Sequence, residues 1–218
     1  MGFVLSLHTS CKSDEPNLET ITDIDGNVYH IVTIGTQTWM VENLKTSKYR
    51  DGTSIPTVAD NAAWAALKNG AYCNYNNDAS KAKKYGKLYN AYAITDSRNI
   101  APDGWHVAND SDWITLTTFI GGDSIAGGKL KETGTAHWTS PNVGATNEFI
   151  FTALPGGYRE HNGEFGGIGN YSYFWSPATN YRGAYIPCYR GIFHKYVYVY
   201  RFEVFWESGF SVRCVRDN

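Results

Sequence analysis

The sequence predicts a single α+β domain, on three observations about the distribution of apolar and turn residues. Segments with helical spacing fall between residues 58 and 120, whereas later segments have the shorter, alternating pattern of strands. Aromatic residues make up 15% of the chain, which also contains 22 glycines, so we expect frequent turns and a core packed on rings. A length of 218 residues is sufficient for one buried core.

The first part of the chain is expected to lie outside this domain. Residues 2–7 are apolar, a single cysteine, Cys11, follows shortly after, and residues 12–22 are polar. This order resembles the end of a bacterial lipoprotein signal, in which the cysteine becomes the acylated first residue. We therefore expect residues 1–22 to be a truncated signal and tether, with lipidation at Cys11, and residues 23–218 to be the domain. The alternative is an unstructured N-terminus with an unmodified cysteine.

Composition restricts the location and the partners. A lipidated Cys11 implies export and an outer-membrane or cell-surface lipoprotein, attached through its lipid only, because no stretch reaches the roughly 20 apolar residues that span a bilayer. A net charge of −2 provides no basic field for phosphates, so we expect no nucleic-acid partner. No Ser-His-Asp order, carboxylate pair or phosphate-binding loop is recognisable, so we expect neither enzymatic activity nor a cofactor.

The domain should open with a β-hairpin. Residues 28–34 and 37–44 are strand-like and flank a tight turn at Gly35 and Thr36. The preceding Asp23-x-Asp25-Gly sequence could suggest a calcium loop. However, a third acidic ligand is missing, and Ile34 stands at the late position that should be Glu. We interpret the segment as a turn stabilised by its own side chains and expect no metal.

Helices are expected early and strands late. The predicted helices cover residues 58–68, 78–85 and 109–120, the last capped by Asn109, and no helix is expected after it. Residues 88–94 fit a strand or a helix equally well. The predicted late strands cover residues 148–154, 171–176, 195–206 and 210–216.

Three cysteines follow Cys11, so at most one disulfide can form among them. They are Cys73, Cys188 and Cys214, and their spacing gives no Cys-x-x-Cys pair for zinc. The sequence alone leaves two pairings open, Cys188 with Cys214 or Cys73 with Cys214.

Nine short motifs are distributed along most of the chain. They occupy residues 34–44, 71–78, 86–92, 102–107, 112–113, 127–132, 151–159, 174–176 and 209–217. In this order they resemble the Fibrobacter succinogenes major paralogous domain, a family common in surface lipoproteins of the Bacteroidetes group. The family often has a cysteine directly before its Pro-x-Gly-Trp motif, where this chain has Ala101, so a familiar disulfide partner is missing.

The resemblance implies a fold similar to C-type lectins and formylglycine-generating enzymes. We therefore expect one C-type-lectin-like domain with two early helices and a mostly antiparallel, loop-rich C-terminal part. Most motif residues have structural explanations, and Trp39, Trp105, Trp113 and Trp175 are expected in the core.

In such folds, the region corresponding to residues 176–206 forms the exposed face on which ligands bind. Here it is rich in aromatic side chains interleaved with arginines, the residue types that dominate binding hot spots. We expect an adhesin-like surface for a protein or glycan ligand on another cell or a host. If the segment around residues 196–205 is an ordinary strand, about half of these residues should be buried. The candidate ligand-binding residues are Tyr181, Arg182, Tyr185, Tyr189, Arg190, Phe193, His194, Tyr198, Tyr200, Arg201, Phe205 and Trp206.

Some proteins of this fold are diversified in this region by retroelements that randomise adenines, typically in Asn codons ending in a pyrimidine. Such codons never yield Lys, Glu, Gln, Met or Trp, and none of these occurs between residues 176 and 194. The pattern favours a retroelement-diversified variable protein, with Lys195, Glu203 and Trp206 as fixed positions.

Two other functions compete with ligand binding. A pilus or fibre assembly subunit would have stable partner proteins and little affinity for free ligands. A formylglycine-generating-type oxidase would need Cys188 and Cys214 as its thiol pair, and Cys214 lies in a motif shared with non-enzymatic relatives. The Glu-Pro-Asn and Trp-Asn-Asp clusters of calcium-dependent lectins do not occur, which favours calcium-independent recognition.

Overall fold

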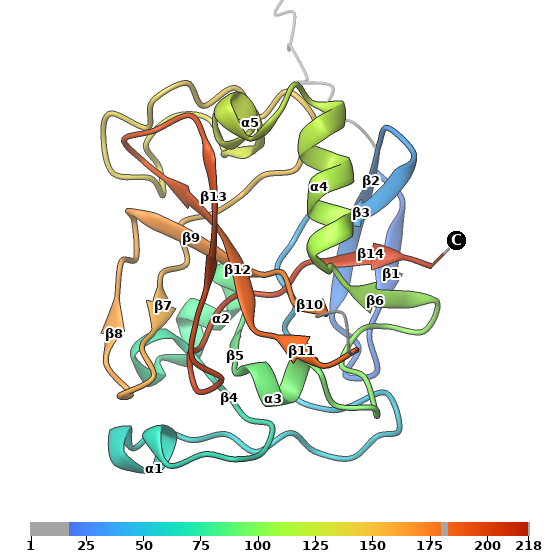
Figure 1. Cartoon of the computed structure of the whole chain (residues 1–218), viewed down its shortest axis with the longest axis vertical. Helices are drawn as coiled ribbons and strands as arrows, with labels where there is room; N and C mark the ends of the chain where they lie inside the picture. Colours follow the sequence, from blue (N-terminus) through green and yellow to red (C-terminus); the bar gives the residue numbers. More distant parts are fainter. Residues whose placement is uncertain (1–17, 180–182, 218) are drawn as a thin grey trace, which may run out of the picture.

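The opening hairpin and the last strand of the chain belong to the larger of the two antiparallel sheets that have more than two strands (Figure 1). The computed structural model describes residues 18–179 and 183–217. In spatial order the larger sheet consists of β1 (Thr20–Thr22), β2 (Val28–Ile34), β3 (Gln37–Met40), β14 (Cys214–Arg216) and β6 (Trp105–Val107). The predicted hairpin is confirmed, with Gly35 at φ +63° in its turn. Thr20–Thr22, which the sequence analysis assigned to the tether, pairs with β2.

The smaller sheet has three strands, in the order β13 (Val199–Glu203), β12 (Cys188–Phe193) and β9 (Tyr171–Trp175). The sequence did not predict β12, because the buried arginine Arg190 interrupts its apolar alternation. Two-stranded pairs complete the strands: β4 (Tyr72–Cys73) with β5 (Leu88–Tyr89), β7 (Tyr158–Arg159) with β8 (Phe165–Gly166), and β10 (Ala178–Thr179) with β11 (Tyr185–Ile186).

Helices cover the middle of the chain and one later segment. They are α1 (Asn61–Ala65), the 3₁₀ turn Tyr75–Asn77, α2 (Ala79–Tyr85), α3 (Ala91–Ile94), α4 (Asp110–Phe119) and α5 (Asp123–Leu130). Asn109 and Asp112 form a capping box at the start of α4, as its sequence predicts. Helix α5 contradicts the prediction of no helix after residue 120 and of only two early helices. Its two glycines lower the intrinsic helix propensity, so the sequence pattern does not predict this helix.

Several predicted boundaries were wrong. The first helix is only Asn61–Ala65, and residues 88–94 are a short strand followed by a short helix. The predicted strand at 148–154 does not form, since Ile150 and Thr152 adopt left-handed backbone angles. The two last predicted strands shrink to Val199–Glu203 and Cys214–Arg216. The α+β class and the mostly antiparallel pairing are confirmed.

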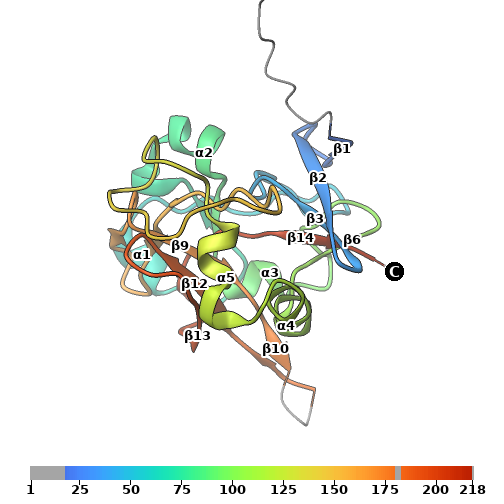
Figure 2. The ribbon, with the colours of Figure 1, turned by 90° about the horizontal axis from the view of Figure 1, so that it is seen from above.

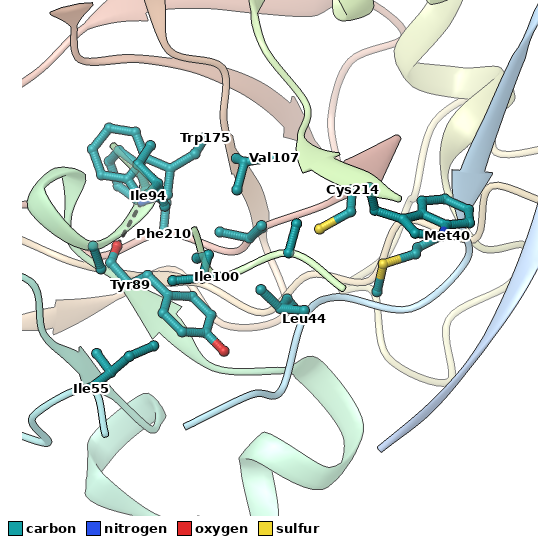
Figure 3. Packing of buried hydrophobic residues seen from close by; sticks show 14 of the residues in the cluster. Met40, Leu44, Ile55, Tyr89, Ile94, Ile100, Val107, Trp175, Phe210 and Cys214 are labelled. Carbon is teal, nitrogen blue, oxygen red and sulfur yellow. Dashed lines mark hydrogen bonds between the residues drawn. The ribbon is translucent and has the colours of Figure 1, made fainter. Parts of the chain in front are cut away.

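The core joins the two sheets through aromatic rings. Helix α4 stands between the sheets in the view of Figure 1, and its Trp113 packs against Trp39 of β3 and Phe174 of β9. The close-up in Figure 3 shows Trp175 above Tyr89, whose carbonyl accepts its Nε1–H at 2.6 Å. All four predicted core tryptophans, including Trp105, are buried. The indole N–H groups of Trp39, Trp113 and Trp175 find partners without leaving the apolar interior.

Disulfides do not contribute to this core. Cys73, Cys188 and Cys214 are free and buried, on β4, β12 and β14, so neither pairing considered from the sequence forms. In the opening turn, Asp23 accepts the backbone N–H groups of Asp25 and Asn27, which confirms the turn interpretation. Across the described residues, no helix has the length and apolar character needed to cross a membrane.

Candidate ligand-binding face

One side of the smaller sheet bears a continuous group of aromatic rings, which we call the aromatic band. Its side chains come from all three strands, from the turn between β12 and β13, and from β7. Each ring centroid lies between 4.2 and 6.4 Å from that of a neighbour in the band. The members are Tyr158, Tyr171, Tyr173, Tyr189, Phe193, Tyr196, Tyr198, Tyr200 and Phe202.

Strand register explains why these rings share a face. Successive side chains of a strand point to opposite sides, so Tyr189, Gly191 and Phe193 of β12 lie on the same side. Tyr189 is opposite Phe202 of β13, and Gly191 is opposite Tyr200. From the other edge, Tyr173 of β9 is opposite Gly191 and Tyr171 is opposite Phe193. The pairing register of the three strands therefore places their aromatic rings on one face.

The rings are tightly packed against one another and against the core. Tyr173 stacks on Tyr158 at 4.9 Å with ring planes only 12° apart, and lies 4.6 Å from Tyr189. Both Tyr173 and Tyr189 rest on Phe210 of the core, at 5.4 and 4.9 Å. Such contacts fix the ring positions before any ligand arrives, which reduces the entropy lost on binding.

Gly191 occupies the middle of the band. A Cβ at this position would lie only 3.2–3.3 Å from ring atoms of Tyr173, Tyr189 and Phe193. The missing side chain thus allows three rings from two strands to converge over the backbone. The glycine gives the band its continuity.

The band is uncharged and partly exposed. Phe202 is 49% exposed and Tyr196 is 45% exposed, while the other members are half-buried. Burial raises the pKa of Tyr173 and Tyr189, and burial together with the Tyr198 hydroxyl raises the pKa of Tyr200 to about 12. These hydroxyls therefore remain neutral near pH 7 and can donate or accept hydrogen bonds. Exposed groups of apolar side chains are candidate interaction surfaces in general.

The opposite side of the same sheet carries paired charges, which involve two arginines of the predicted site. Arg190 is buried, and its Nη2 lies 2.6 Å from Oδ1 of Asp110 at the start of α4. Arg201, opposite Arg190 in the register, donates from Nε to both carboxylate oxygens of Asp110, at 2.9 and 3.0 Å. Both arginines therefore connect the sheet to α4 instead of lying on the aromatic band.

His194, another residue of the predicted site, is buried. It is only 9% exposed, and its Nδ1 lies 3.2 Å from the carbonyl oxygen of Thr139. The side chain thus ties the end of β12 to a neighbouring loop and offers no surface to a ligand.

The other predicted residues lie away from the band or outside the described residues. Tyr185 is 49% exposed on β11, and Phe205 is 60% exposed over His161. Trp206 is half-buried against Tyr92. The remaining predictions lie outside the described residues: Cys11, Tyr181 and Arg182.

Of the predicted residues, the structure therefore brings four into the band: Tyr189, Phe193, Tyr198 and Tyr200. Sequence reasoning missed five members of the band: Tyr158, Tyr171, Tyr173, Tyr196 and Phe202. The alternation of Tyr171 and Tyr173 within a predicted strand was the available signal. It could not show that this face would be open to solvent.

A hollow of about 690 Å³ lies apart from the band, between the start of α4 and the β10–β11 hairpin, and Tyr185 is part of its lining. Its ionisable groups already have partners. Asp96 pairs with Arg98, Asp110 with two arginines, and His106 with two carboxylates. The band is the stronger candidate for a binding site because its exposed side chains are not engaged in ion pairs. Within the described residues, no group of three His, Cys, Asp or Glu side chains could hold a metal.

A family profile matches most of this chain. The Fibrobacter succinogenes major domain corresponds to residues 32–216. The chain belongs to this family. Neither a curated protein nor a solved structure shows a significant match. Most members of the band lie between the family motifs at 174–176 and 209–217 or just before them.

The arginines of two family motifs have structural roles. Arg159 donates to the carbonyls of Val58 and Ala59 at 2.6 and 2.8 Å. Arg213 donates to those of Met40 and Phe151 at 2.9 and 2.8 Å. Each buried guanidinium thereby satisfies backbone carbonyls far away in the sequence. The motifs maintain the scaffold that presents the band.

Proposed function

We propose that this protein is an exported, lipid-anchored surface protein that binds a protein or glycan ligand through the aromatic band, without catalysis. The observation that carries the proposal is the continuous, uncharged and partly exposed group of rings. Tyrosines offer a large apolar surface with a hydrogen-bonding tip and lose little entropy on binding. A C-type-lectin-like fold and attachment through Cys11 are part of the same proposal.

The test measures binding of the purified protein to intact bacterial and host cells by flow cytometry. Loss of binding after protease treatment of the cells indicates a protein ligand, and loss after periodate oxidation indicates a glycan. The double variant Tyr200→Ala, Phe202→Ala should lose binding, because it removes two stacked rings from the exposed end of the band.

A matched control comes from α4. Phe119 is 58% exposed but lies outside the band, so Phe119→Ala should bind like the unchanged protein. Equal loss of binding in both variants would show non-specific apolar adhesion and would contradict the proposal. Absence of binding by the unchanged protein to any of the cells would also count against it.

Retroelement diversification remains part of the proposal. Within β12, Cys188 and Ile192 are buried on the scaffold side, whereas Tyr189 and Phe193 belong to the band. Diversification should therefore spare the former positions and change the latter. Deep sequencing of the gene's 3′ end across a cell population tests this, together with a search for a nearby template that differs only at adenines. A single invariant sequence without a template would contradict it.

Self-association is the second candidate, because an exposed apolar band can also bind another copy of the chain in a fibre. Sedimentation of the purified protein distinguishes the two: a monomer favours ligand binding, whereas band-dependent oligomers favour an assembly subunit. Thiol oxidation has less support, since Cys188 and Cys214 lie in different sheets and burial raises the pKa of both thiols.

A further inference from the structure

Lys131 is a buried lysine without a carboxylate partner among the described residues. It is the C-cap residue directly after α5, and it is 0% exposed. Its Nζ donates to the carbonyls of Val143, Phe193 and Tyr196 at 2.8, 3.1 and 3.0 Å. An ammonium group has three N–H donors, so these carbonyls use its full capacity. Burial lowers the pKa of Lys131 to about 8, and the group is still mostly charged at pH 7.

Two glycines of α5 hold the same part of the chain. The N–H of Gly128 donates to the carbonyl of Val197 at 2.9 Å. A Cβ on Gly127 would lie 2.5 Å from the carbonyl oxygen of Tyr198, and one on Gly128 would lie 2.6 Å from that of Gly144. Only glycine permits this approach. We call Gly127, Gly128 and Lys131 the seat, and residues 193–198 the tyrosine turn.

The tyrosine turn carries one end of the aromatic band. Phe193, Tyr196 and Tyr198 lie within it. The ring centroids of Phe193 and Tyr198 lie 4.6 and 4.2 Å from that of Tyr200. The hydrogen bonds between the seat and this turn all end on backbone carbonyls: those of Phe193 and Tyr196 accept from Lys131, and that of Val197 accepts from the Gly128 N–H. It can therefore fix the turn whatever side chains the turn presents.

We infer that the seat is a positioning device for ligand binding: Lys131, Gly127 and Gly128 hold the tyrosine turn in its binding conformation before a ligand arrives. Its consequence for affinity rests on the proposed function. Ordering a loop in advance lowers the entropy that binding would otherwise cost. Lys131 is thus a positioning residue that need not touch the ligand.

Hydrogen–deuterium exchange of the backbone amides at pH 6.5 tests the inference without a ligand. In Lys131→Met the side chain keeps its length but loses its donors, so amides of the tyrosine turn should exchange about tenfold faster or more. Amides of β2 and β3 should keep their rates. Lys129→Met is the matched control, since Lys129 is on the same helix and pairs at the surface with Glu148. It should leave the turn unchanged.

Two results would overturn the inference. One is unchanged exchange in the turn, and the other is an equal acceleration throughout the domain, which would indicate a purely structural role. Should Lys131→Met fail to fold, Lys131→Gln retains two donors and should give an intermediate acceleration confined to the turn.

Affinity is measured separately, with the cells that bind the unchanged protein as the probe. Lys131→Met should weaken that binding about tenfold, and Lys129→Met should not. If no cell binds the unchanged protein, the proposed function fails while the exchange result stands. If binding occurs and Lys131→Met leaves it unchanged despite a loosened turn, the positioning role is refuted and the proposed function stands.

Discussion

The two faces of the three-stranded sheet differ in what their side chains bind. The inner face directs Arg190 and Arg201 to one carboxylate, Asp110, and packs in part against α4 and α5. The outer face presents rings that contact one another and solvent. Both faces come from the same short strands, so a change of one residue in register would exchange them. Residues of the inner face thus maintain the fold, whereas residues of the outer face are available to a ligand.

The largest effect is expected on the inner face. Asp110→Asn removes the anionic partner of a buried guanidinium and should lower the free energy of unfolding by about 3–5 kcal/mol. Chemical denaturation measures this. Asp123→Asn is the control, because its carboxylate lies farther from Arg190, at 3.5 Å, and is 52% exposed. Similar stabilities for the two variants would show that the inner face is not held by the Asp110 pair.

On the outer face, the main effect should be on binding. Tyr189→Ala removes the ring that joins Tyr173, Phe202 and Phe210, so it should weaken ligand binding by about 2 kcal/mol. Titration of the protein onto ligand-bearing cells gives the affinity. Tyr185→Ala, equally aromatic but outside the band, should leave the affinity unchanged. A loss of affinity in Tyr185→Ala but not in Tyr189→Ala would place the binding site beside the β10–β11 hairpin.

The faces should also respond differently to pH. Burial alone would raise the pKa of Asp110, but hydrogen bonds from Arg201 and Arg190 outweigh it and hold that pKa below its ordinary value. Its stabilisation is therefore complete above the unfolded-state pKa of about 3.9 and is lost as the pH falls through the lower folded-state value. Thermal melts from pH 6 to 2 should show this loss, and Asp110→Asn should show less of it.

Binding by the outer face should change little between pH 5 and 8, because the raised pKa values of Tyr173, Tyr189 and Tyr200 keep these hydroxyls neutral over that range. A steep change in affinity within this interval would indicate that an ionisable group outside the band contacts the ligand.

The smallest effect concerns the cysteines. Because the three described thiols are free, a reductant should leave the melting temperature unchanged. Burial raises the pKa of Cys73 to about 12, so native protein should react slowly with thiol reagents and rapidly after unfolding. A melting temperature lowered by reductant would reveal a disulfide and contradict the structure.

Local chemistry explains which elements were predictable. The hairpin of β2 and β3 and the capping box of α4 depend on neighbours a few residues apart, and both were found. Helix α5 was missed because its glycines serve a contact with a distant turn. Strand β12 was missed because Arg190 acquires its partner from α4. In each missed case the stabilising contact is remote in sequence.

The sequence by itself determined the α+β class, the antiparallel hairpin, the core tryptophans and, through its motifs, the family. It also indicated that the region of residues 176–206 is rich in residues suited to binding. Only the tertiary structure decided which of them face solvent, because orientation on a strand depends on register and on what covers each side. Tyr189 and Arg190 are adjacent in the chain, yet one belongs to the aromatic band and the other to a buried ion pair.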